Sequence, residues 1–110
     1  MGIVVNLYYT GQNGSALRFA REMEERGIAA KIRAEEGNEK YEYFTSMKDP
    51  ETVLLIDSWK DQESLDRHHA SAMMNEIAEL REKYDLHMSV ERYISDSEGV
   101  PDRDQAFIRK

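Results

Sequence analysis

The sequence contains no cysteine. Disulfide bonds, thiolate zinc sites and a cysteine nucleophile are therefore excluded. The lack of disulfides fits a reducing cytoplasm, which is the location we predict, although exported proteins can also lack cysteine. Residues 1–6 show neither the basic region nor the apolar core of a signal peptide. No apolar run approaches the ~20 residues that a membrane helix needs, so we expect no membrane partner.

The sequence also has fewer basic than acidic residues. The chain has 15 lysines and arginines against 22 aspartates and glutamates, which gives a net charge of −7. This balance opposes non-specific binding to nucleic acid or to an anionic membrane, and no run of basic residues overrides it. We therefore predict that neither of these is a partner.

Motifs that hold cofactors or build nucleophiles are missing as well. The sequence has no Gly-x-Gly-x-x-Gly, no Walker-type loop and no Gly-x-Ser-x-Gly elbow. Its three histidines do not stand at metal-ligand spacing from one another or from a carboxylate. We predict no cofactor and no metal.

What remains is the composition of one small folded domain. Of 110 residues, 40% are hydrophobic and 34% are charged, which suits one modest core under a charged surface. We assign residues 1–94 to this domain and residues 95–110 to a polar, irregular C-terminal tail. The pattern predicts four strands, at 3–9, 41–47, 52–59 and 86–94. It also predicts helices from 15 to about 36, at 61–70 and at 71–84. We expect the first helix to be capped by Asn13 or Ser15 and bent at Gly27.

The order β-α-β-β-α-β predicts an α+β, ferredoxin-like fold, in which two crossover helices cover one face of a four-stranded antiparallel sheet. The opposite face then needs another cover. The strands are apolar on both alternating sets, since Val53 and Leu55 point one way and Leu54 and Ile56 the other. We therefore predict a homodimer, and the alternative is that the tail folds over the open face.

Two passages carry a resemblance to a known family. Residues 33–43 contain an acidic-Gly-x-x-x-Tyr pattern, and residues 55–71 contain an acidic-x-Trp pair followed by Leu65-x-x-His68. In order and spacing over residues 3–94, the chain resembles the antibiotic-biosynthesis monooxygenase family. The resemblance implies a dimeric α/β barrel with one pocket per subunit between helices and sheet. Several members oxidise phenols or quinols with oxygen and use neither metal nor flavin.

The resemblance therefore implies a cofactor-independent monooxygenase acting on a small phenolic or quinol-type aromatic substrate. One alternative is a non-catalytic dimeric barrel that binds or senses a small molecule. A second is a haem-degrading relative on the same fold. Asn6 matches the strand asparagine of those enzymes, but His68 stands in place of their helix tryptophan and Ala78 in place of their haem-ligating histidine.

Three residues are candidates for catalysis. His68 shares a helix face with Leu65 and matches the family motif, so it can take a phenolic proton near neutral pH or serve as a structural histidine. Trp59, at a strand end, can orient a substrate oxygen through its indole N–H or belong to the core. Asn6 lies within an apolar strand, where its amide binds a substrate oxygen or a dioxygen-derived anion, or else makes a cross-strand or dimer hydrogen bond.

Five further residues are candidates for lining a pocket that would hold a flat aromatic ring. The candidates are apolar or aromatic residues near those three positions, each of which can instead belong to the core. They are Tyr41, Tyr43, Leu65, Met73 and Met74. His69 lies about 100° round the helix from His68, so we expect it to point elsewhere and to be exposed.

Overall fold

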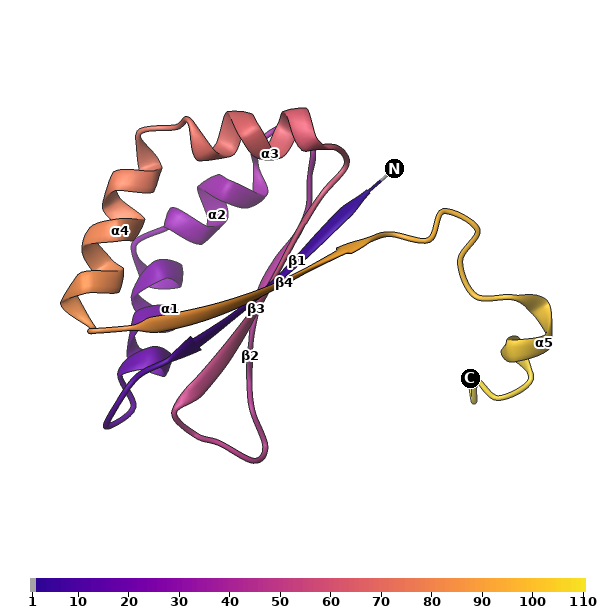
Figure 1. The fold of residues 1–110 in the computed structure, drawn as a ribbon, viewed down its shortest axis with the longest axis horizontal. Helices are drawn as coiled ribbons and strands as arrows, with labels where there is room; N and C mark the ends of the chain where they lie inside the picture. The colour runs from indigo at the N-terminus through magenta and orange to yellow at the C-terminus, as the bar shows by residue number, and fades with distance from the viewer. Residues whose placement is uncertain (1) are drawn as a thin grey trace.

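The fold is a single antiparallel sheet with helices packed on one face (Figure 1). The computed structural model describes residues 2–110. Its strands lie in the order β2-β3-β1-β4, which confirms the predicted ferredoxin-like arrangement. The elements are β1 (Ile3–Thr10), α1 (Ser15–Glu25), α2 (Ile28–Arg33), β2 (Asn38–Thr45), β3 (Thr52–Trp59), α3 (Gln62–His69), α4 (Met73–Lys83), β4 (His87–Ile94) and α5 (Asp102–Gln105).

The first helical segment differs from the prediction in two details. Gly27 adopts a φ of 74°, a conformation that glycine reaches without steric penalty, and it separates α1 from α2 instead of bending one helix. At the start of α1, Gly14 is the N-cap residue and no side chain caps the helix. The predicted cap by Asn13 or Ser15 is therefore wrong, because the Ser15 hydroxyl accepts instead from the backbone N–H of Gln12.

The alternation along β3 decides which side chains meet the helices. Val53, Leu55 and Asp57 are buried on the helix side, and β1 places Leu7 and Val5 opposite the last two of these. This face and the helices enclose the hydrophobic core. Its largest fully buried side chains are Trp59, Tyr9, Phe19, Met23, Ile28, Ile32, Leu55, Ile77 and Val53.

The opposite face of the sheet carries no helix. Val4, Asn6 and Tyr8 of β1 lie on it, beside Leu54 and Ile56 of β3 in the antiparallel register. All five residues are half-buried. We call this surface, together with Phe44 of β2, the open face.

Residues 95–110 extend away from the domain and do not cover the open face (Figure 1). Every side chain of the tail is exposed, and Phe107 is 89% exposed. The alternative in which the tail folds over the sheet is therefore not what this structure shows. The tail is also less irregular than predicted, since it contains the single turn α5. Within residues 2–110, no helix is long and apolar enough to cross a membrane.

Candidate active site

A cavity of about 240 Å³ lies between the helices α3 and α4 and the strands β1, β3 and β4. Its volume exceeds the ~150 Å³ that is enough to hold benzene. Most of its wall is apolar, and three polar side chains converge on it, as is typical of small-molecule sites. The lining residues are Val5, Leu7, Asp57, Leu65, His69, Met74, Arg81, Met88 and Val90. Val90 on the edge strand β4 is 54% exposed, so the cavity has an apolar wall that is open to solvent.

Asp57 is the carboxylate of this cavity. It points to the helix side from β3, where its side chain is only 6% exposed. The indole Nε1–H of Trp59 donates to its Oδ1 at 2.6 Å. Burial raises the pKa of Asp57 to about 6, against the opposing effects of the Trp59 hydrogen bond and the charge of His68. A carboxyl group with this pKa is a proton acceptor matched to neutral pH.

Arg81 brings a positive charge to the same cavity from α4. Its Nη2–H donates to the Tyr9 hydroxyl at 2.9 Å, which holds the guanidinium in place. Among residues 2–110, its buried Nε–H has no hydrogen-bond acceptor. The Arg81 side chain also lines the cavity, so the N–H groups on its cavity side can donate to an oxygen, most favourably an anionic one, of a molecule there.

His69 is exposed, as expected, and it also lines the cavity. Its ring lies 5.7 Å from that of His68, which is buried. Burial, and to a lesser degree the charge of His68, lower the pKa of His69. At neutral pH the imidazole is therefore mostly uncharged, and one of its nitrogens can accept a hydrogen bond.

The structure brings Trp59 and His68 together, but it places both behind the cavity wall. The two rings stack at a centroid distance of 4.9 Å with an interplanar angle of 27°. Trp59 is fully buried and His68 is 4% exposed. The indole N–H is occupied by Asp57, and Nδ1 of His68 lies 2.9 Å from a carboxylate oxygen of Glu35. Neither side chain is among those lining the cavity.

Of the five residues predicted to form the pocket walls, some line the cavity and others do not. Leu65 and Met74 line the cavity, whereas Met73 packs at the edge of the core. Tyr41 is buried in the core, and its hydroxyl lies 3.4 Å from that of Tyr43. Tyr43 faces a different groove beside α1.

Asn6 is separated from all of these by the sheet itself, because it lies on the open face. Its Oδ1 is buried and has no hydrogen-bond donor within residues 2–110. The structure therefore does not bring Asn6 into one site with Trp59 and His68. Any role of Asn6 in binding therefore involves a group that covers the open face.

Asp57 and Arg81 were missed as site residues, although the sequence carries a signal for each. Asp57 is the acidic residue of the acidic-x-Trp pair, and in a strand residues two apart share a face. A carboxylate in register with Val53 and Leu55 is therefore expected on the helix side. Arg81 lies one helical turn after Ile77, on the border of the apolar stripe of α4.

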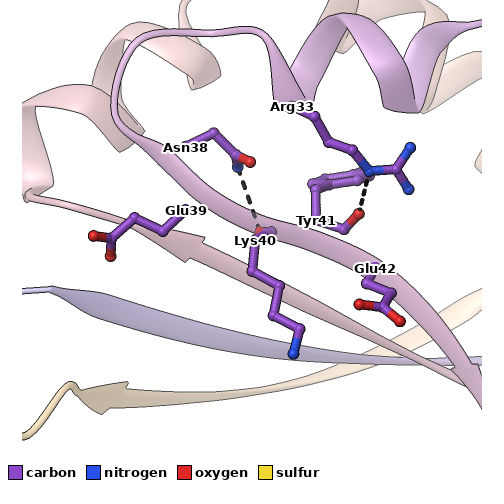
Figure 2. Close-up of a pocket in the computed structure, with 6 residues that line it drawn as sticks. All are labelled: Arg33, Asn38, Glu39, Lys40, Tyr41 and Glu42. Carbon is purple, nitrogen blue, oxygen red and sulfur yellow. Dashed lines mark hydrogen bonds between the residues drawn. The ribbon is translucent and has the colours of Figure 1, made fainter.

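A second hollow, of about 420 Å³, follows the free edge of β2 (Figure 2). Its polar groups are already engaged, since Arg33 Nε donates to the Tyr41 carbonyl at 2.7 Å and Asn38 Nδ2 to the Lys40 carbonyl. The Arg33 guanidinium also pairs with Glu24. The remaining lining side chains, Glu39, Lys40 and Glu42, are exposed and of mixed charge. This surface offers an aromatic molecule little apolar wall, so we take the cavity around Asp57 as the site.

An apolar cavity with a carboxylate, a guanidinium and an imidazole, placed between the helices and the sheet of a ferredoxin-like domain, has the features typical of a small-molecule site. Comparison with known proteins gives the family. Residues 2–80 match the model of the antibiotic biosynthesis monooxygenase family, which is more than two thirds of the chain. The chain belongs to that family. No curated protein matches it significantly.

Many solved structures share the fold. A conserved protein from Methanosarcina mazei is 24% identical, with a TM-score of 0.72 over 87% of this chain and 94% of that one. A protein from Pseudomonas aeruginosa is 22% identical, with a TM-score of 0.73 over 87% and 95%. SnoaB, a cofactor-independent oxygenase from Streptomyces nogalater, is 11% identical, with a TM-score of 0.71 over 87% and 94%. At these identities the likeness establishes the fold.

Proposed function

We propose that this protein is a cofactor-independent monooxygenase that oxidises a small phenol or quinol with molecular oxygen. The observation that carries the proposal is Asp57, a carboxylate with a pKa of about 6 in the wall of an apolar cavity. Family membership supports a monooxygenase-type function. The size and apolar lining of the cavity favour a flat aromatic substrate.

The chemistry begins with removal of a phenolic proton by Asp57. The electron-rich anion passes one electron to oxygen, and the resulting pair combines to a peroxide on the ring. Loss of water then leaves a quinone-type product. One oxygen atom enters the product and the other leaves as water. The full reduction of O₂ takes four electrons, and the substrate supplies all of them, so no further reductant is needed.

Arg81 and His69 stabilise and orient the reacting groups in this proposal. The guanidinium of Arg81, which lines the cavity, binds the anionic oxygen that forms when the proton leaves. His69, which is mostly uncharged at neutral pH, accepts a hydrogen bond from a second hydroxyl of a quinol. The apolar lining side chains, such as Leu65 and Met74, pack against the aromatic ring of the substrate.

The test is a screen of small quinols and phenols in an oxygen electrode. We expect consumption of one oxygen molecule per quinol and incorporation of one ¹⁸O atom from ¹⁸O₂ into the product. The rate should fall as the pH drops through about 6, because the Asp57 carboxylate is then protonated. Heat-denatured protein is the control for spontaneous oxidation. A protein-dependent rate that shows no acid limb would contradict the role of Asp57.

The second candidate function is a binding module without catalysis, and the same screen separates the two. Saturable binding of a quinol with no oxygen uptake would favour the module. The haem-degrading alternative is weakened by the fold, since Asn6, its one matching position, lies on the side of the sheet away from the cavity.

We also predict that the purified protein is colourless and metal-free. Within the described part of the chain, residues 2–110, no three histidine, aspartate or glutamate side chains are grouped so as to hold a metal ion. A visible absorption spectrum and elemental analysis provide the measurement. A flavin spectrum, or iron in stoichiometric amount, would overturn the cofactor-independent mechanism.

We propose further that the protein works as a homodimer joined through the open face. Val4, Leu54 and Ile56 form an apolar centre on a face that no helix covers. A second copy placed there also puts a polar partner within reach of the unsatisfied Asn6 oxygen. A cytoplasmic location stays a prediction.

A further inference from the structure

Three buried or half-buried polar side chains form a chain behind the cavity, and the proposed reaction does not use them directly. Trp59 donates its indole N–H to Asp57 Oδ1 at 2.6 Å. The face of the same indole stacks on His68, and His68 Nδ1 meets the carboxylate of Glu35 at 2.9 Å. Glu35 lies between α2 and β2, so the chain of contacts links that connection, α3 and β3.

We propose that Trp59 is the positioning residue of Asp57, and that His68 and Glu35 hold the indole in place. This inference rests on the proposed function only in taking Asp57 as the base. Trp59 and His68 do not line the cavity, and in this proposal they affect the reaction through Asp57.

The geometry of β3 explains why Trp59 suits this task. Residues 57 and 59 are two apart in a strand, so their side chains leave the same face of the sheet. The indole N–H occupies one carboxylate oxygen, and among residues 2–110 no group donates to the other one. The second oxygen is therefore left for a substrate hydroxyl in the cavity that Asp57 lines.

The bond also keeps Asp57 in its reactive state. A hydrogen bond to an ionised carboxylate favours the charged form and so opposes the effect of burial on its pKa. The indole N–H in turn needs an acceptor, because it is fully buried. The indole can keep this direction only while its ring is held, and the stacked His68, anchored by Glu35, prevents it from turning.

The first measurement does not depend on turnover. Trp59 is the single tryptophan, so its emission reports on the contacts of this one indole, the Asp57 bond and the stacked His68, and Asp57→Asn separates the two. We expect the emission to titrate with a midpoint near pH 6, and we expect this transition to vanish in Asp57→Asn. A parent protein whose emission does not respond to the protonation of Asp57 would overturn the proposal, whether or not any quinol is oxidised.

The second measurement removes the donor. Trp59→Phe keeps an aromatic ring and loses the N–H, and we expect the midpoint of Asp57 to rise by about one pH unit. Carboxyl ¹³C NMR, with the signal assigned by its absence in Asp57→Asn, gives the value without activity. In an active enzyme the acid limb of kcat/KM should move by the same amount. Leu55→Val, a buried change on the same strand that does not touch the bond, is the matched control and should leave the midpoint in place. An unchanged midpoint in Trp59→Phe would overturn the proposal.

Glu35→Ala tests the anchor and retains Trp59, so it also serves if Trp59→Phe does not fold. The negative charge of Glu35 raises the pKa of Asp57. Loss of that charge alone therefore lowers the midpoint, whereas a released indole raises it. A higher midpoint supports the anchoring role of Glu35 and His68, and a lower or unchanged one overturns it.

Discussion

Replacement of Asp57 by asparagine should lower the rate of quinol oxidation about 10²–10⁴-fold, the usual effect of losing a general base. Asparagine has the same shape, and its side-chain oxygen can still accept the Trp59 N–H, so the cavity keeps its form. The amide cannot take a phenolic proton near neutral pH. Oxygen consumption at saturating quinol gives the measurement.

The same substitution should raise thermal stability at pH 8. The pKa of Asp57 is about 6 in the folded protein, against an ordinary value of 3.8. The fold thus favours the protonated form, and the stability that this provides is fully present below about pH 4 and lost as the pH rises through about 6. Above that pH the buried charge costs on the order of 3 kcal/mol, since each pKa unit corresponds to about 1.4 kcal/mol. The asparagine side chain carries no charge, so we expect the Tm of Asp57→Asn to rise by roughly 5–15 °C at pH 8 and to change little at pH 4.

Asp66→Asn is the matched control for both effects. Asp66 lies on α3 with its side chain exposed, and its hydrogen bond to Gln62 is at the surface. This variant should keep the parent's rate and shift stability by less than ~0.5 kcal/mol. An Asp57→Asn protein that oxidises quinols at the parent rate would remove Asp57 from the mechanism. One that melts lower at pH 8 would show that the ionised carboxylate stabilises the fold.

Ile56→Asp should convert a dimer to a monomer. The parent should have twice the 12.8 kDa mass of one chain by light scattering at micromolar concentration. Ile56 lies near the centre of the open face, where a second copy would enclose an unpaired carboxylate, and such burial commonly costs about 3–5 kcal/mol. The effect on the folded monomer should be small, because no helix covers this face.

The position of the charge matters for this test. Val5, the neighbour of Asn6 on β1, lines the cavity instead, so a charge there would disturb the site and not the interface. Asn75→Asp, on the exposed side of α4, is the matched control and should leave the mass unchanged. A parent protein of 12.8 kDa would refute the dimer, and a dimeric Ile56→Asp variant would place the interface elsewhere.

Much of the architecture followed from the sequence by itself. Alternation along residues 52–59 and the short link before them predicted the central hairpin, and the apolar stripes predicted the helices that cross over it. Both are local properties, because strand and helix periods are set by the backbone. The family was implied by the resemblance that the acidic-x-Trp and Leu-x-x-His passages carry, and this resemblance also placed Trp59 and His68 close to the site.

Only the tertiary structure decided which residues line the cavity. Periodicity says that His68 and Leu65 share a helix face, but it does not say which residue meets the core and which meets a cavity. That depends on how α3 is rotated against β3: His68 meets Trp59, and His69 and Leu65 reach the cavity. The same applies to Arg81, which enters the site because α4 packs over Tyr9 of β1, a residue 72 positions away. Contacts between distant segments arise from packing, and for this reason the carboxylate and the guanidinium of the site became apparent only in the folded chain.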